Sequence, residues 1–259
     1  MPIVTLTSDF GAVDYHSGAL KGTLLSAFPS LTIVDISHNI EHYNIVQAAF
    51  VFKNAWNRFP TKTVHCLIIN DLPHHPIPYI ALEREGHYFL GPDNGIFHLI
   101  FGEHRGPIYR LDLPKETVFP AADILAKACA HLAGGKSIET IGEPTTGLVQ
   151  RISFQPVISQ HQIRGSIIYV DHYGNAVTNI TRSLFDQVAQ GRPFALYFRR
   201  HDPLVRLSRH YADVEVGAPL CLFNATDHLE VAIHMGNAHQ LLGLNVEDGI
   251  QIDFLPATE

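Results

Sequence analysis

Apolar and polar positions alternate in blocks along the first part of the chain. The segments 3–7, 31–36 and 64–69 are short, β-branched and apolar, which is typical of buried strands. Between them, Leu20–Phe28 and Ile45–Phe59 carry apolar residues at helical spacing, and each run stops at a proline. The alternation of strands and helices predicts right-handed crossovers and a largely parallel sheet.

The same pattern continues to about residue 152. Residues 79–83 and 87–90 are predicted to form a hairpin, and residues 121–132 an Ala-rich helix that ends at Gly134. The segment 141–147 has turn composition without periodicity, and we interpret it as the approach to a linker. The first predicted domain is therefore an α/β domain over residues 1–152 with a mostly parallel sheet.

The second part of the chain has a different pattern, with several short strands and few helices. Only 182–190 has helical spacing, together with about one turn at 237–242. The predicted strands are 162–170, 193–199, 220–224, 230–234 and 249–255. Such a run predicts a smaller all-β domain, barrel-like or a sandwich, over residues 153–259.

Composition restricts the class of protein. Hydrophobic residues make up 46% of the 259 residues and charged residues 17%, which is typical of a globular chain with a large core. The net charge of −7 and the absence of Lys/Arg runs argue against a nucleic-acid partner. We find no signal-peptide pattern and no apolar run long enough to span a membrane, and the three cysteines are widely separated. A soluble cytoplasmic protein is therefore expected.

The 17 histidines raise the question of a metal site. No HExxH motif is present, and the close pairs, such as His38 with His42 and His234 with His239, lack a recognised ligand spacing. Neutral surface or half-buried histidines explain the count more simply. We therefore predict no metal and no cofactor.

Polar clusters follow several of the predicted strands. They are Asp9 with Asp14, Asp71, Asp93 with Asn94, the stretch 170–179, and the stretch 224–230 leading to 235–238. Polar groups at the carboxyl ends of parallel strands line the ligand-binding edge of a sheet. Two structural readings stay open, because Asp9 can cap a turn or helix and 91–95 can be only a tight turn.

The chemistry of these clusters suits a nucleoside. Carboxylates and amides, with Tyr43 and Tyr173 nearby, fit a ribose diol, a purine face and an ammonium group. No P-loop and no GxGxxG motif is present, so a phosphate group is not expected.

Several motifs together resemble one family. They are TSDFG at 7–11 followed by Asp14, GALKG at 18–22, DISH at 35–38, GPDNG at 91–95, DHYGNAVTNI at 171–180 and GNA at 236–238. In this order, the motifs resemble the S-adenosyl-L-methionine hydroxide adenosyltransferases, the adenosine-forming S-adenosylmethionine hydrolases related to fluorinase and chlorinase. The resemblance extends from Ile3 to about Ile252. It implies an α/β domain, a C-terminal β-barrel-like domain, and a homotrimer that binds its ligand at subunit interfaces.

The resemblance also implies roles for individual residues. Asp9 corresponds to a ligand of the ribose hydroxyls, Asp14 and Asp171 to residues at the methionine end, and Tyr43 to an aromatic on the adenine. Asp93 and Asn94 are further candidates for contact with the substrate. The remaining candidates face the adenine and are Tyr173, Asn175, Asn237 and Ala238.

The candidate catalytic loop departs from the family pattern. The family uses an Asp, an Arg and a His around the attacking water, and Asp71 matches the Asp of the motif Asp-Pro-Gly-Val-Gly. Here the loop lacks the glycines, no Arg occurs between Asp71 and Arg84, and the place of the His reads Val118-Phe119-Pro120. His74 and His75 are candidates for a substitute base, because imidazole titrates near neutral pH.

Two functions therefore remain open. The first is hydrolysis of S-adenosylmethionine to adenosine and methionine by attack of water at C5′. The alternative is a catalytically impaired relative that binds S-adenosylmethionine or adenosine without turnover. Use of a halide is disfavoured, because the carboxylate of Asp71 stands where the halogenases carry an uncharged residue and repels an incoming anion.

Overall fold

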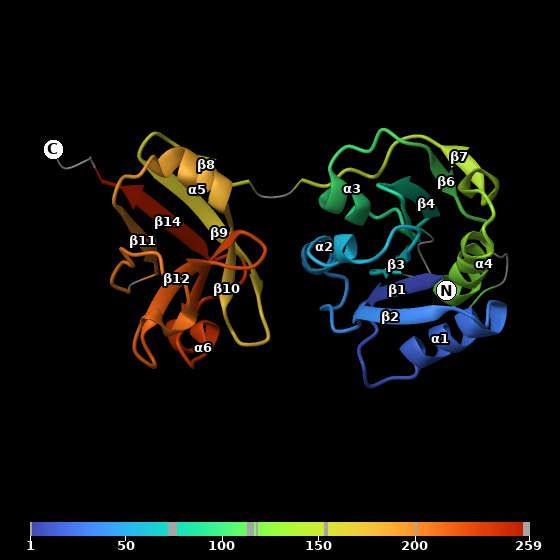
Figure 1. Cartoon of the computed structure of the whole chain (residues 1–259), viewed down its shortest axis with the longest axis horizontal. Helices are drawn as coiled ribbons and strands as arrows, with labels where there is room; N and C mark the ends of the chain where they lie inside the picture. Colours follow the sequence, from blue (N-terminus) through green and yellow to red (C-terminus); the bar gives the residue numbers. More distant parts are fainter. Residues whose placement is uncertain are drawn as a thin grey trace. The chain divides into compact units, whose positions relative to one another are not determined.

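The computed structural model divides the chain into two compact units, residues 1–152 and 153–259. The structure describes residues 2–71, 77–112, 117, 119–152, 155–199 and 201–255. Each unit is described by itself below (Figure 1).

A mixed sheet forms the centre of the first unit. In its described part, seven strands lie in the order β2-β1-β3-β5-β4-β6-β7. The first four are parallel and are β2 (Thr32–Ser37), β1 (Ile3–Ser8), β3 (Val64–Ile68) and β5 (His87–Pro92). The other three continue the sheet in antiparallel pairs and are β4 (Tyr79–Arg84), β6 (Ile108–Arg110) and β7 (Glu143–Thr145). The predicted α/β class and the hairpin at 79–90 are confirmed.

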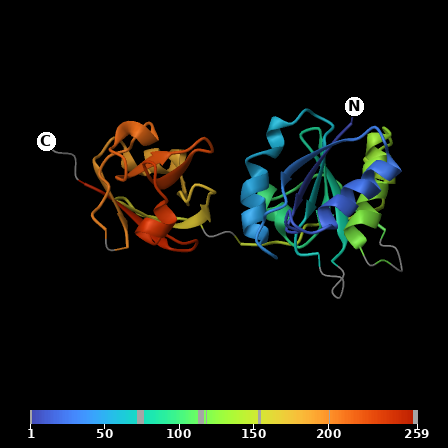
Figure 2. The ribbon, with the colours of Figure 1, turned by 90° about the horizontal axis from the view of Figure 1, so that it is seen from below.

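Helices cover both faces of this sheet, as Figure 2 shows. On one face α1 (His16–Ala27) and α4 (Pro120–Ala133) pack over the strands, and on the other α2 (Ile45–Lys53) and α3 (Ile96–Phe101) do so. The short helices η1 (Trp56–Arg58) and η2 (Ile138–Thr140) complete the unit. All five residues of β3 are buried, as expected of a central strand with helices on both sides.

A curled antiparallel sheet forms the second unit. Within the described residues its strands lie in the order β11-β14-β9-β10-β13-β12, and β8 pairs with β9. The strands are β8 (Val157–Ile158), β9 (Gln162–Val170), β10 (Ala176–Thr181), β11 (Phe194–Phe198), β12 (Pro219–Phe223), β13 (His228–Ile233) and β14 (Gly249–Phe254). The helices are α5 (Arg182–Ala189), η3 (Tyr211–Asp213) and α6 (Ala238–Leu242). The sheet is an open half-barrel with antiparallel pairing. The predicted all-β character of this part of the chain is confirmed.

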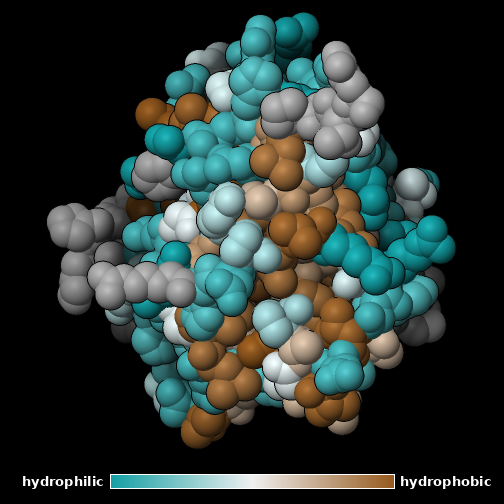
Figure 3. Space-filling view, turned by 90° about the vertical axis from the view of Figure 1, so that its left-hand side faces the viewer, coloured by the Kyte–Doolittle hydropathy of each residue, from teal (hydrophilic) through white to brown (hydrophobic). Residues whose placement is uncertain are grey.

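Apolar side chains also reach the surface of the second unit. Figure 3 shows one of its faces, where apolar residues gather in a continuous area bordered by polar ones. The exposed large apolar side chains of this unit include Val205, Val216 and Met235. Exposed apolar areas of this kind are typical of interaction surfaces.

Three segments differ from the sequence-based predictions. The helix expected from Ile45 to Phe59 ends at Lys53, and the chain continues through η1. The stretch 176–181, expected as part of a polar loop, forms strand β10, and 143–145 forms the edge strand β7. Among the described residues, the helices are all too short or too polar to cross a membrane.

Candidate functional site

The carboxyl ends of the four parallel strands meet at one edge of the first unit's sheet. Asp9 directly follows β1, His38 follows β2, and Asp93 follows β5. Asn70 and Asp71 lie just beyond the end of β3. The edge therefore collects the acidic residues that the sequence placed after these strands, at the usual ligand-binding position of an α/β sheet.

Asp9 connects three separate segments at this edge. Its Oδ2 accepts hydrogen bonds from the backbone N–H of Tyr43 at 3.0 Å and of Asn70 at 3.1 Å. Both donors sit in left-handed backbone, with φ of 66° for Tyr43 and 56° for Asn70. This geometry fixes one oxygen of the carboxylate, Oδ2. Tyr43, whose backbone it binds, is 59% exposed.

Asp71 is half-buried close to Asp9. Burial raises the pKa of its carboxyl above the ordinary value, and the negative charge of Asp9 raises it further. The Tyr79 hydroxyl and the backbone N–H of Ala121 act in the opposite direction. Ala121 lies in the first turn of α4, so the N-terminus of this helix faces the carboxylate. A carboxylate with a raised pKa is a stronger base, as proton transfer from water requires.

Tyr79 was not predicted from the sequence as a site residue. It begins β4, its side chain is fully buried, and its hydroxyl makes no hydrogen bond of ordinary geometry with the described residues. It nevertheless lies near enough to Asp71 to lower the pKa of that carboxyl. No local signal in the sequence relates the two residues, because they meet only when β3 and β4 are in the sheet.

Aromatic rings form an apolar wall beside the two acidic residues. The ring centroids of Phe10 and Phe119 lie 5.7 Å apart, and His16 packs against both at 5.8 and 6.0 Å. Phe10 follows Asp9 directly, and Phe119 lies two residues before Ala121. The sequence analysis named Phe119 only because it occupies the place of the family's His. In the structure, its ring is part of this wall.

The other candidates of the first unit lie in different surroundings. Asp14 lies on the exposed loop between β1 and α1. Asp93 accepts a hydrogen bond from the Val149 N–H at 3.0 Å, and burial raises its pKa. Asn94 is buried, donates to the Ile69 carbonyl at 2.7 Å and accepts from the Ile96 N–H at 3.2 Å. The turn at 91–95 thus holds backbone segments together. His74 and His75 lie outside the described residues.

A second group of candidates lies together in the second unit. Asp171 accepts hydrogen bonds from the backbone N–H groups of Tyr173 and Asn175 at 2.9 and 2.8 Å, and from the Asn175 side chain at 3.0 Å. Tyr173 is 77% exposed. The turn between β9 and β10 is thus closed around the Asp171 carboxylate and leaves an aromatic side chain exposed.

The segment at 236–238 packs on the same turn. His239 donates its backbone N–H to the Gly174 carbonyl at 2.8 Å, and Asn237 accepts from the Gln240 N–H at 2.9 Å as the N-cap of α6. A Cβ at Gly174 would lie 2.2 Å from the Asn237 side chain, so only glycine fits there. The segment 236–238 therefore packs against the turn that carries Asp171, Tyr173 and Asn175.

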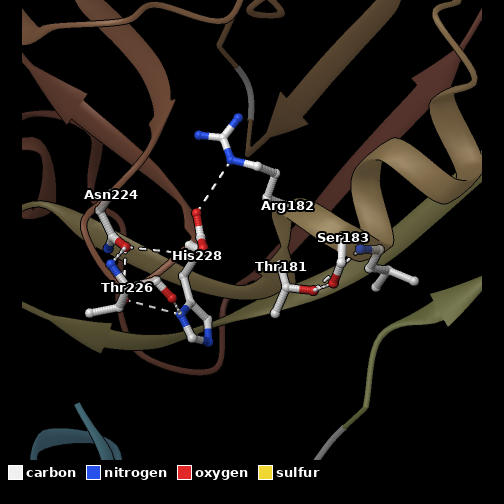
Figure 4. A network of polar contacts seen from close by, with 8 residues as sticks. Thr181, Arg182, Ser183, Asn224, Thr226 and His228 are labelled. Atoms are coloured by element: carbon white, nitrogen blue, oxygen red, sulfur yellow. Dashed lines mark hydrogen bonds and ion pairs between the residues drawn. The ribbon is translucent and has the colours of Figure 1, made fainter.

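The last polar cluster, at 224–230, closes the turn between β12 and β13. Asn224 accepts hydrogen bonds from Thr226 and from the His228 N–H, and Arg182 pairs with Asp227 at 3.3 Å (Figure 4). Asn224 also donates to the buried Glu230. Within the described residues, these contacts are internal and form a stable turn.

The described residues offer no metal site, and a hollow in the second unit is not lined by candidate residues. Among the described residues, no group of three or more His, Cys, Asp and Glu side chains is arranged to hold a metal ion. A hollow of about 220 Å³ in the second unit is lined by residues of 203–208, 213–214 and 219–220, none of which was a candidate.

Comparison with known proteins places this geometry in a family. Residues 4–142 match the model of the SAM hydroxide adenosyltransferase N-terminal domain, and residues 165–251 match that of the C-terminal domain. An (R)-S-adenosyl-L-methionine hydrolase of Methanocaldococcus jannaschii is 27% identical over 97% of this chain and 96% of its own length. A fluorinase of Nocardia brasiliensis is 25% identical over 89% of this chain and 90% of its own.

Solved structures share the fold of this chain. The crystal structure of an uncharacterized conserved protein from Thermotoga maritima superposes with a TM-score of 0.87 at 25% identity, covering 97% of this chain and 99% of that one. A conserved hypothetical protein from Thermus thermophilus gives a TM-score of 0.75 at 25% identity, with 98% and 100% covered. Since the two family models together span most of the sequence, this chain belongs to the SAM hydroxide adenosyltransferase family.

Proposed function

We propose that this protein hydrolyses S-adenosyl-L-methionine to adenosine and L-methionine. The observation that carries the proposal is the pair of acidic residues at the sheet edge, where Asp71 has a raised pKa beside the anchored Asp9. Relatives named (R)-S-adenosyl-L-methionine hydrolase, which match nearly the full length of the chain, support the same reaction.

The proposed step is a displacement at C5′ of the substrate. The oxygen of a water molecule bonds to C5′, the C5′–S bond breaks with its electron pair moving to sulfur, and a proton of the water passes to Asp71. The sulfonium is already an activated leaving group, so alignment and exclusion of other water contribute most of the rate. Asp9 would hold the ribose hydroxyls, and the apolar wall of Phe10 and Phe119 would limit solvent near the reacting carbon.

The remaining candidates complete this proposal. Asp14, Asp93, Asn94 and Asp171 are proposed around the methionine and ribose, and the others around the adenine: Tyr43, Tyr173, Asn175, Asn237 and Ala238. His74 and His75 stay candidates for a substitute base.

We further propose a cytoplasmic homotrimer with the ligand between subunits. The exposed apolar area of the second unit is suited to an interface between copies of the chain. Light scattering that gives three chain masses would support the trimer.

The reaction is tested by incubating the purified protein with S-adenosylmethionine and separating the products by chromatography. We expect adenosine and methionine in equal amounts from the wild type and from Asp123→Asn, and almost none from Asp71→Asn. Asp123 is a suitable control because it is an exposed carboxylate in the first turn of the same helix α4. Tight binding of S-adenosylmethionine without product would instead favour the alternative, a binding protein without turnover.

A further inference from the structure

A chain of polar contacts runs from α1 to the end of β1. Lys21 Nζ lies 2.6 Å from Asp35 Oδ2, and Asp35 Oδ1 lies 3.2 Å from Nε2 of His38. His38 Nδ1 lies 2.6 Å from the hydroxyl oxygen of Ser8, the residue directly before Asp9. Four side chains from α1, β2, the loop after β2, and β1 are thereby connected.

The Ser8 hydroxyl contacts two groups at once. Its oxygen accepts the backbone N–H of Phe10 at 3.3 Å and lies 2.6 Å from His38 Nδ1, where the hydroxyl or the ring donates according to the His38 tautomer. Burial raises the pKa of Asp35, but the hydrogen bond from Lys21 and the nearby charges of His38 and Lys21 bring it below its ordinary value. The Nε2 contact departs from ideal hydrogen-bond geometry, so the ionised Asp35 orients the ring mainly through its charge.

In serine hydrolases, a Ser–His–Asp arrangement activates the serine hydroxyl as a nucleophile. The arrangement of Ser8, His38 and Asp35 cannot do so. The Ser8 side chain is completely buried, whereas an attacking serine must reach its substrate. His38 is also buried, with 9% of its surface exposed. The arrangement is therefore suited to holding the backbone in place.

The backbone that it holds is the loop carrying Asp9. Before Asp9, the Ser8 hydroxyl is fixed by His38; after Asp9, the Phe10 N–H bonds to Ser8 and the Gly11 N–H bonds to the His38 carbonyl at 2.8 Å. We propose that His38 is a positioning residue, which orients the Asp9 carboxylate for the substrate ribose. This inference rests on the proposed function.

The same strand offers a matched control. Thr5 Oγ1 lies 2.7 Å from His65 Nδ1, so β1 contains a second buried hydroxyl–histidine pair. Thr5 lies three residues before Ser8, away from the carboxyl end of the strand and from Asp9. Removing either hydroxyl should cost similar stability, and only Ser8 should affect the substrate.

The test compares Ser8→Ala with Thr5→Val, and His38→Leu with His38→Asn. Ser8→Ala and His38→Leu should raise KM for S-adenosylmethionine about tenfold with little change in kcat, because the lost interaction affects ground and transition state alike. His38→Asn should restore KM to within about threefold of wild type, since a side-chain amide can donate to or accept from the Ser8 hydroxyl. Thr5→Val should lower the melting temperature and leave KM unchanged. A KM unchanged in both Ser8→Ala and His38→Leu would overturn the positioning role.

A second measurement works without turnover. Hydrogen exchange of the Tyr43 and Asn70 amides, both bonded to Asp9, reports where that carboxylate lies in the free protein. Faster exchange in Ser8→Ala than in Thr5→Val supports the positioning of Asp9 even if the wild type does not hydrolyse S-adenosylmethionine. Equal exchange in the two variants would overturn the inference, while product formation by the wild type decides the proposed function separately.

Discussion

The two buried histidines that bond to β1 differ mainly in what surrounds them. His65 is completely buried, lies 3.2 Å from His87 through its Nε2, and is enclosed by the rings of Phe52, Trp56 and Phe89. His38 carries a similar hydroxyl bond but lies at the carboxyl edge of the sheet, next to the loop of Asp9. The first pair is closed inside the core on the α2 and α3 side, and the second supports a loop at the ligand-binding edge.

The comparison indicates that two similar hydroxyl–histidine contacts have different roles according to where they lie in the sheet. Burial lowers the pKa of His65 to about 3, with a further contribution from His87, so this imidazole stays neutral and stabilises the core. At the carboxyl edge of the sheet, burial raises the pKa of the Asp71 carboxyl, which suits the general-base role that we propose for it. We therefore expect substitutions in the first region to change mainly stability and substitutions in the second to change mainly catalysis.

Asp71→Asn should have the largest effect on catalysis. Loss of the proposed base should lower kcat about 100-fold to 1,000-fold. The melting temperature should stay unchanged or rise, because the substitution removes a half-buried charge that Asp9 repels. Steady-state kinetics and calorimetry check the two effects. A fall in melting temperature as large as that of a His65 variant would contradict the separation.

Acidification should destabilise the protein through His65. Since its pKa is lower in the folded state than in the unfolded state, the stabilisation is present above about pH 6.5 and is lost as the pH falls toward 3. Between pH 7 and pH 5 the loss should be about 2 kcal/mol. Urea unfolding at the two pH values checks this, and His65→Leu should show a smaller difference. An equal pH dependence in that variant would assign the effect to other groups.

Tyr79→Phe should change the pH profile more than the stability. The Tyr79 hydroxyl lowers the pKa of Asp71, so its removal should raise that pKa and move the acid limb of kcat/KM to higher pH. Because this hydroxyl makes no hydrogen bond of ordinary geometry with the described residues, the melting temperature should change little. The pH profile of the variant gives the answer, and an acid limb at lower pH would show that the hydroxyl acts differently.

Asp9→Asn should move the same acid limb in the opposite direction. The charge of Asp9 raises the pKa of Asp71, so a neutral amide should lower that pKa and extend activity to more acidic solution. Binding should weaken at the same time, so kcat/KM at neutral pH falls. If the limb does not move, the two carboxylates do not interact as proposed.

Much of the fold could be predicted from local patterns. The strand at 64–68 is continuously apolar and the helix at 120–133 has a proline at its start and a glycine after its end, so both were found close to their bounds. Strand β10 was missed because it directly follows the loop-like residues 171–175 and contains Asn179, although Thr178 is buried and bonds to the Leu229 carbonyl. Its pairing with β9 and β13 decides its conformation.

The candidate site could be predicted only in part, for a similar reason. Asp9 and Asp71 were found because each follows a strand, which is a local feature of the sequence. Tyr79 approaches Asp71 only in the folded sheet, so no spacing in the sequence indicates it. His38 belongs to the DISH motif at 35–38, but its contact with Ser8, 30 residues away, cannot be inferred from that motif. The composition of the turn at 91–95 does not by itself distinguish a ligand loop from a structural turn, since the Asn94 amide also holds the Ile69 carbonyl.

The most direct test of the central claim is hydrolysis of S-adenosylmethionine in water enriched in ¹⁸O, with mass spectrometry of the adenosine. Attack of water at C5′ predicts one ¹⁸O atom in the 5′-hydroxyl of adenosine, formed by the wild type and scarcely by Asp71→Asn. Adenosine without the label, or no adenosine at all, would contradict the account.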